Sequence, residues 1–116
     1  MKLLIAGSRG FQDYSGLCEV LHQLFKDEKI DLIISGGARG ADQLGERYAK
    51  EHNIPVKQYL PDWDLFGKSA GIRRNKTMCE NADCLVAFWD GESRGTRFTI
   101  EYMQSLGKQT KVCLYR

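Results

Sequence analysis

The sequence lacks several features that would assign the protein to a functional class. It has no run of like charge and a net charge of only +2, so charge alone does not indicate a nucleic-acid partner. No apolar stretch approaches the roughly 20 residues of a membrane-spanning helix. The apolar segment at residues 1–7 is too short for a signal peptide and is typical of a first strand. We therefore expect no membrane partner.

The cysteines form no redox or metal motif. No C-x-x-C pair is present, and Cys79 and Cys84, at a predicted helix-to-strand turn, have no histidine close by. Three of the four cysteines fall on predicted apolar faces, which favours buried free thiols and a cytoplasmic protein. We expect no metal and no cofactor. The four residues are Cys18, Cys79, Cys84 and Cys113.

Several catalytic and nucleotide-binding motifs are also missing. No Ser-His-Asp or Cys-His arrangement is visible, because His22 and His52 fall on predicted helices away from the loops. The loop after the first strand lacks the G-x-G-x-x-G fingerprint of dinucleotide-binding proteins. The segment at 67–69 is not a P-loop, because Asp62 stands where that motif needs its first glycine.

The chain alternates apolar strands with amphipathic helices. We predict strands over residues 2–6, 31–35, 55–60, 83–88 and 110–115. We predict helices over about 14–28, 40–52, 69–81 and 96–106, with a long loop at 61–69. This alternation is typical of one α/β domain, residues 1–116, with a five-stranded parallel sheet covered on both faces by four main helices. The strand order we favour is 3-2-1-4-5, which places the loops after strands one and four at one crevice.

Glycine- and arginine-bearing loops follow three of these strands, at residues 7–10, 36–42 and 91–96. Backbone amides and helix amino termini at this edge of a parallel sheet favour an anion such as phosphate. The alternative for 36–42 is a tight turn that needs positive φ. Asp42 has two open roles, capping its helix or accepting a hydrogen bond from a ligand hydroxyl. Other carboxylates near this edge, Asp90 among them, are expected to be solvated.

Basic residues also open the predicted third helix, at 67–75, where they oppose the helix dipole unless an anion lies between them. The alternative is a solvated basic helix start. We expect Trp63, Phe66 and Trp89 to pack against the crevice wall, with stacking on a base as the alternative. The full set of ligand-binding candidates is Gly7, Ser8, Arg9, Gly36, Gly37, Ala38, Arg39, Gly40, Asp42, Asp62, Trp63, Lys68, Arg74, Asn75, Trp89, Ser93, Arg94, Gly95 and Thr96.

These motifs resemble the SLOG superfamily, which groups the Rossmann-like domain of DNA-processing protein A with the Lonely Guy cytokinin-activating enzymes. The resemblance is strongest to its YspA, cpYpsA-related branch and covers nearly the whole chain. It implies a Rossmann-like three-layer sandwich that binds a nucleotide or nucleotide-derived ligand and forms a homodimer or higher homo-oligomer. The matching segments are Gly7-Ser8-Arg9, residues 35–42, Asp62-Trp63, Gly67-Lys68, Ala70-Gly71, Arg74-Asn75 with Met78, and Ser93-x-Gly95-Thr96.

Lonely Guy enzymes cleave the N-glycosidic bond of nucleoside monophosphates with an arginine and a glutamate. Arg74 matches the arginine, whereas the glutamate position holds Thr99, and Glu101 lies two residues further on. The catalytic candidates are therefore Arg74, Glu101 and Asp42.

Three functional hypotheses follow. The leading one is binding of a phosphorylated nucleotide or derivative, with the phosphate on the loops at 36–40 and 93–96. The second is N-glycosidic hydrolysis of the Lonely Guy type. The third, single-stranded nucleic-acid binding, ranks last because the chain has no extended basic stripe.

Overall fold

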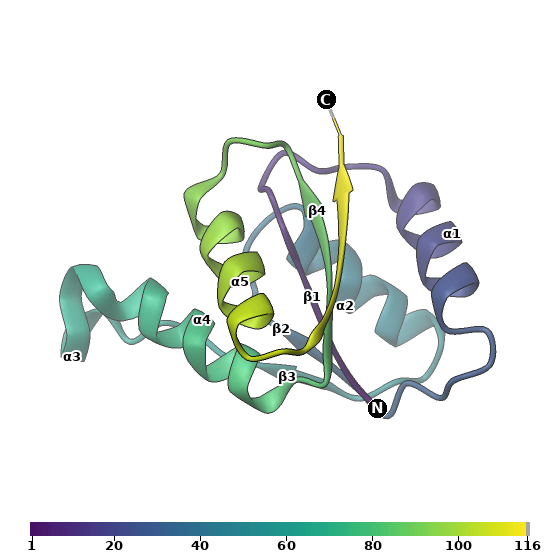
Figure 1. Ribbon diagram of the computed structural model, residues 1–116, viewed down its shortest axis with the longest axis horizontal. Helices are drawn as coiled ribbons and strands as arrows, with labels where there is room; N and C mark the ends of the chain where they lie inside the picture. Colours follow the sequence, from purple (N-terminus) through teal and green to yellow (C-terminus); the bar gives the residue numbers. More distant parts are fainter. Residues whose placement is uncertain (116) are drawn as a thin grey trace.

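The computed structural model describes residues 1–115 and contains one parallel five-stranded sheet with the order β3-β2-β1-β4-β5 (Figure 1). The predicted fold class and strand order are confirmed. Along the chain the elements are β1 (Lys2–Gly7), α1 (Tyr14–Leu24), β2 (Leu32–Ser35), α2 (Ala41–Glu51), β3 (Val56–Gln58), α3 (Trp63–Phe66), the 3₁₀ turn η1 (Gly67–Ser69), α4 (Ala70–Asn81), β4 (Cys84–Trp89), α5 (Arg94–Ser105) and β5 (Gln109–Leu114).

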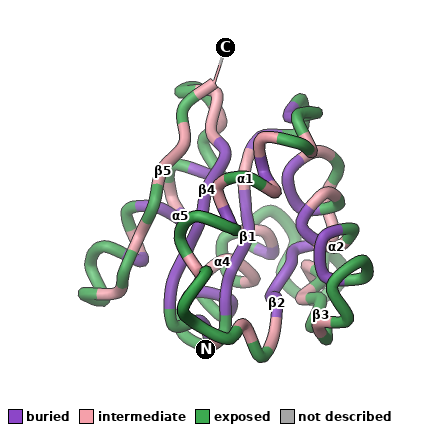
Figure 2. Tube along the Cα trace, turned by 90° about the vertical axis from the view of Figure 1, so that its right-hand side faces the viewer, coloured by how far each residue is buried: buried purple, intermediate pink, exposed green. Residues whose placement is uncertain are grey.

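The central strands are apolar on both sides because helices cover both faces of the sheet. Along β1, Leu3 and Ile5 face one layer, and Leu4 faces the other. All three side chains are fully buried, and Figure 2 shows β1 and β4 as the most buried part of the trace. Burying one such side chain stabilises the fold by about 1.5–3 kcal/mol.

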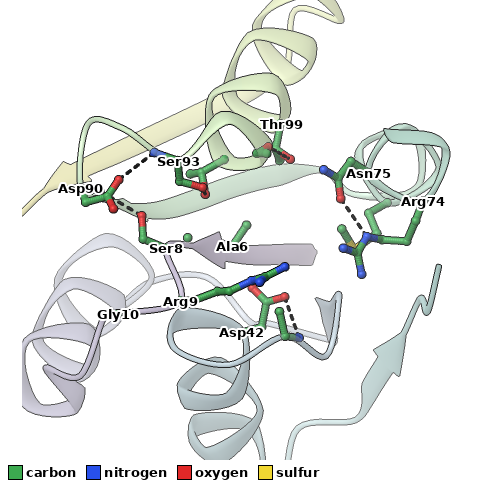
Figure 3. Close-up of a pocket in the computed structure, with 15 residues that line it drawn as sticks. Ala6, Ser8, Arg9, Gly10, Asp42, Arg74, Asn75, Asp90, Ser93 and Thr99 are labelled. Carbon is green, nitrogen blue, oxygen red and sulfur yellow. Dashed lines mark hydrogen bonds between the residues drawn. The ribbon is translucent and has the colours of Figure 1, made fainter. Parts of the chain in front are cut away.

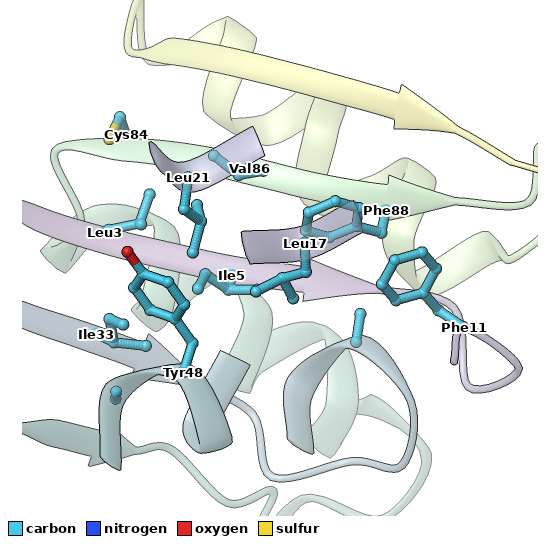
Figure 4. Close-up of a cluster of buried hydrophobic side chains, with 12 residues drawn as sticks. Leu3, Ile5, Phe11, Leu17, Leu21, Ile33, Tyr48, Cys84, Val86 and Phe88 are labelled. Carbon is cyan, nitrogen blue, oxygen red and sulfur yellow. The ribbon is translucent and has the colours of Figure 1, made fainter. Parts of the chain in front are cut away.

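The helices form two layers around this sheet (Figure 1). On one side, α1 and α2 contribute Leu17, Leu21 and Tyr48 to a core with the odd-numbered residues of β1 (Figure 4). On the other side, α4 and α5 contribute Met78 and Met103 to a core with the alternate residues of the same strands. The predicted inner faces of these helices therefore rest on the sheet as expected.

Strand β1 pairs in parallel with both β2 and β4, so the chain reverses its direction of sheet growth between β1 and β4. In open α/β sheets the crevice beyond the carboxyl ends of such strands is the usual ligand site. The loops after β1 and β4 leave from this one edge.

Two local predictions are wrong. The first helix ends at Leu24 rather than near residue 28. Residues 26–29, which follow Phe25, are all charged, so they offer no apolar side chain that could pack on the sheet. The long loop at 61–69 contains α3 and η1. Asp62 starts α3 by accepting a hydrogen bond from the Leu65 amide at 3.0 Å, and Gly67, with φ of 55°, ends it.

The four cysteines are free thiols, as predicted, although Cys18 and Cys113 are only partly buried. Burial raises the pKa of Cys79 and of Cys84 to about 11, so both remain protonated at neutral pH. No helix within residues 1–115 has the length and apolar character needed to cross a membrane.

Candidate functional site

A cleft of about 390 Å³ opens at the carboxyl edge of the sheet, between the loops that follow β1 and β4 (Figure 3). The first turns of α2 and α5 border it, and α4 closes one side. Its lining residues are Ala6, Gly7, Ser8, Arg9, Gly10, Ala38, Asp42, Arg74, Asn75, Met78, Asp90, Ser93, Gly95, Thr96 and Thr99.

Ser8 ties the loops after β1 and β4 together at the floor of the cleft. Its amide donates to the Phe88 carbonyl at 2.9 Å, and its Oγ accepts from the Asp90 amide at 3.1 Å. The side chain is buried. Because both bonds join Ser8 to the end of β4 and its loop, Ser8 fixes the spacing of the two loops at the floor of the cleft.

The loop after β4 is shaped by Asp90. Its Oδ1 accepts hydrogen bonds from the amides of Glu92 and Ser93, both at 2.9 Å. These bonds hold the pKa of Asp90 below its usual range, because they stabilise the carboxylate. The Trp89 Nε1 donates to the Ser93 carbonyl at 3.0 Å. Together they direct the start of α5 into the cleft.

The amino terminus of α5 is left open. Ser93, its cap residue, makes no side-chain hydrogen bond to the helix amides; its Oγ instead lies 3.1 Å from Thr96 Oγ1. Within residues 1–115, no carbonyl or side chain accepts a hydrogen bond from the amides of Gly95 and Thr96. The first turn therefore presents free donors and the positive end of the helix dipole to the cleft.

The loop before α2 is organised differently. The Gly37 amide donates to Ser35 Oγ, and the Ala38 amide donates to Asp42 Oδ2, both at 3.1 Å. At Gly40, which has φ of 77°, an added Cβ would lie 2.4 Å from the Ser8 carbonyl oxygen. This loop thus uses its glycines for a tight turn and for close packing against the β1 loop, and two of its amides for contacts inside the protein.

Asp42 is the buried carboxyl of the cleft, with 7% of its surface exposed. Burial raises its pKa from 3.8 to about 6, although the Ala38 amide and the charge of Arg74 act in the opposite direction. The side chain of Arg9 extends into the cleft toward Asp42 (Figure 3). A carboxyl with such a pKa exchanges its proton near neutral pH.

Arg74 reaches the cleft from α4. Its Nη1 donates to the carbonyls of Gly36, at 2.7 Å, and Tyr59, at 3.2 Å, and its Nε donates to Asn75 Oδ1 at 2.8 Å. A Cβ at Gly36 would lie 2.7 Å from this Nη1 and 2.9 Å from Asp42 Oδ2. A side chain at position 36 would displace the Arg74 guanidinium or the Asp42 carboxyl, because both converge on it.

The basic side chains at this edge have no acidic partner. The ion pairs within residues 1–115 join the Met1 amino group to Asp31, Lys29 to Asp31, and Arg47 to Glu51, and all lie outside the cleft. Within the part of the chain that the structure describes, Arg9 and Arg74 line the cleft without a carboxylate at ion-pair distance. A bound anion would meet positive charge that Asp42 offsets only in part.

The structure brings ten of the predicted site residues to the cleft. They are Gly7, Ser8, Arg9, Ala38, Asp42, Arg74, Asn75, Ser93, Gly95 and Thr96. The others do not line it. Gly36, Gly37 and Gly40 shape the loop beside it, Arg39, Lys68, Arg94 and Glu101 are exposed, Asp62 and Trp63 belong to α3 and its cap, and Trp89 is partly buried beside β4.

Among the aromatic residues, two of the three predictions are wrong. Trp63 and Phe66 do not pack against the wall of this cleft: Trp63 is 58% exposed, and Phe66 is 40% exposed with Arg73 over its ring at 4.5 Å. Both belong to α3, which does not line the cleft. Trp89 is the one of the three that contacts a cleft loop.

Sequence reasoning missed Ala6, Gly10, Met78 and Thr99 as lining residues and expected Asp90 to be solvated. Helical spacing is the signal for two of them. Met78 is one turn after Arg74, and Thr99 is one turn after Gly95, so both face the same side as a predicted residue. Thr99, at the Lonely Guy glutamate position, lies in the cleft, whereas Glu101 does not.

Comparisons with known proteins find a sequence family and a relative. The sequence model of the YspA, cpYpsA-related SLOG family matches residues 1–66. The Gene 61 protein of Mycobacterium phage D29 is 34% identical over 113 residues, which cover 91% of this chain and 90% of that protein. No solved structure matches the chain.

Proposed function

The chain belongs to the YspA, cpYpsA-related SLOG family, and from this premise we propose that it binds a phosphorylated nucleotide or nucleotide derivative in the cleft between β1 and β4. Membership of the SLOG family indicates a nucleotide-related function in general terms. The observation that carries the specific proposal is the open start of α5. Its free amides lie in a cleft that also holds two arginines without acidic partners.

The phosphate binds at α5 rather than at the loop before α2. Gly37 and Ala38 already donate their amides to Ser35 and Asp42. The Asp42 carboxylate would repel a phosphate there. At α5, by contrast, the amides of Gly95 and Thr96 are accompanied by two hydroxyls and by Asn75, whose Nδ2 would be 3.9 Å from a Cβ at Gly95.

Asp42 contacts the sugar in this arrangement. It lies across the cleft from the start of α5, and it has acceptor capacity beyond its bond to the Ala38 amide. A ribose hydroxyl that donates to this carboxylate would distinguish a nucleotide from free phosphate, because a hydrogen bond to a charged group contributes about 1.5–3 kcal/mol.

Calorimetric titration tests the proposal, with nucleoside mono- and diphosphates and dinucleotides added to the wild type, Gly95→Asp and Gly71→Asp. Gly95 and Gly71 are each the second residue of a helix, and neither has a positive φ. An added Cβ would meet only Asn75 at 3.9 Å or Trp63 at 3.6 Å. Both variants should therefore fold.

We expect Gly95→Asp to weaken nucleotide binding at least about tenfold, because its carboxylate would occupy the phosphate position. Gly71→Asp lies outside the cleft and should bind as the wild type does. A wild type that binds none of these ligands contradicts the proposed function. Equal affinities for the two variants contradict the position of the phosphate.

A second candidate, N-glycosidic hydrolysis, is favoured by the convergence of Arg74 and Asp42 on Gly36. As the bond between ribose C1′ and the base nitrogen breaks, its electron pair leaves with the base, and a carboxylate stabilises the positively charged ribose until water gives its hydroxyl to C1′ and a proton to the base. Asp42 is the carboxylate in the cleft that fits this role. Chromatography of nucleoside monophosphates incubated with wild type and Asp42→Asn decides it, since base release that does not exceed the buffer rate excludes the reaction.

A further inference from the structure

A second surface of interest lies outside the cleft. Residues 60–72, here called the arm, comprise the end of the β3 loop, α3, η1 and the start of α4. Five of the nine large apolar side chains that are exposed within residues 1–115 belong to this short segment. They are Leu60 (67% exposed), Trp63 (58%), Leu65 (69%), Phe66 (40%) and Ile72 (49%).

The arm packs little against the rest of the fold. Neither α3 nor η1 contains a buried residue, although Ala70, where α4 begins, is buried. Figure 1 shows α3 beyond the end of α4, away from the sheet. A single helical turn is only marginally stable in water. Large exposed apolar side chains gathered in one short segment favour a surface that another molecule covers.

We propose that the arm docks against the arm of a second copy of this chain. A two-fold interface needs a surface that complements itself, and the arm provides one. Beside its exposed apolar side chains lies a hollow of about 330 Å³, bordered by Leu60, Phe66, Ala70 and Arg73. A side chain such as Leu65 from one copy fills the hollow of the other.

The charges of the arm are arranged in the same way. Asp64 stands near its amino end, Lys68 stands toward its carboxyl end, and Arg73 follows directly after the arm. None of the three forms an ion pair within residues 1–115. When two arms pack antiparallel, the acidic end of each meets the basic end of the other. The mixed charge favours this arrangement over a uniformly charged partner.

The dimer would border the ligand site. Arg74 lines both the hollow and the cleft, so the contact lies on the other side of an arginine that the nucleotide proposal uses. The dimer proposal itself does not depend on any ligand. Because the arm is short, the interface is small, and we expect a dimer that dissociates on dilution.

Sedimentation velocity over a range of concentrations tests this, with Leu65→Asp and Leu114→Asp as a matched pair. The two leucines are 69% and 68% exposed, but Leu114 lies on β5 at the opposite edge of the sheet. We expect a concentration-dependent dimer for the wild type and for Leu114→Asp. Leu65→Asp should raise the dissociation constant at least about tenfold. Circular dichroism confirms that both variants are folded.

A charge exchange provides a second measurement. Asp64→Lys should weaken the dimer because like charges then face each other, and adding Lys68→Asp to it should restore the dimer. The proposal is overturned by a wild type that stays monomeric at every concentration, by equal effects of the two leucine variants, or by a double charge variant that does not recover.

Discussion

The two helices that begin at the cleft differ in the backbone that leads into them. At α2, the Gly37 and Ala38 amides of the preceding loop donate to Ser35 and Asp42, and the Ala41 amide donates to the Ser8 carbonyl at 3.4 Å, so a carboxylate of the protein already lies beside this helix start. At α5, the amides of Gly95 and Thr96 have no acceptor within residues 1–115. Similar glycine-rich sequences thus produce a closed, structural loop in one case and an open, anion-ready helix start in the other.

The largest expected effect concerns the glycines of these two loops. Gly40→Ala should destabilise the protein by about 3 kcal/mol or more, because φ is 77° and the new Cβ would lie 2.4 Å from the Ser8 carbonyl. Gly95→Ala should stabilise it by about 0.5–1 kcal/mol, because alanine favours a helix and its Cβ has space. Urea unfolding measures both. Similar losses in the free energy of unfolding for the two variants would mean that the two glycines do not differ in how tightly they are packed.

Asp42 makes the closed loop sensitive to pH. The pKa of Asp42 is about 6 in the folded protein, against an ordinary value of 3.8. Between these two pH values the carboxyl is therefore more protonated in the folded state than in the unfolded chain. The free energy of unfolding should therefore fall as the pH rises from about 4 to above 6, by at most about 3 kcal/mol from this residue.

Asp42→Asn should remove that part of the pH dependence while it keeps an oxygen for the Ala38 amide. Urea unfolding of both proteins across this pH range measures it. Parallel curves for the wild type and the variant would show that the carboxyl is not buried as described.

The smallest expected effect concerns the caps. Ser93→Ala should cost less than about 0.5 kcal/mol in the absence of ligand, because the side chain of Ser93 makes no hydrogen bond to the amides of α5. Asp13→Ala is the matched control and should cost about 1 kcal/mol, because Asp13 Oδ1 accepts from the Gly16 amide at 2.9 Å. Thermal unfolding compares them. A loss for Ser93→Ala as large as for Asp13→Ala would mean that α5 is already capped.

The sheet could be predicted because its signals are local. Apolar strands such as residues 2–6 alternate with helices that have one apolar face, and a parallel sheet with covered faces follows from that alternation. The strand order follows from the same pattern and places the loops after β1 and β4 together. The position of the cleft was therefore accessible from the sequence.

The contacts of individual residues inside the cleft could not be predicted from the sequence in the same way. The sequence allows Asp42 two roles, capping its helix or accepting from a ligand hydroxyl. Neither role implies the hydrogen bond that the Ala38 amide of the preceding loop donates to its carboxylate. That contact depends on three-dimensional placement. The arm was also missed, because the loop that contains it has no apolar periodicity and α3 depends on the cap formed by Asp62.

Amide NMR during a titration reports directly on whether the start of α5 binds the phosphate. Nucleoside monophosphate added to ¹⁵N-labelled protein should produce saturable shifts that are largest at the amides of Gly95 and Thr96. The amides of Gly37 and Ala38, which are already bonded within the protein, should shift little. The largest shifts at Gly37 and Ala38, with Gly95 and Thr96 unchanged, would mean that the ligand binds at the loop before α2 and not at α5.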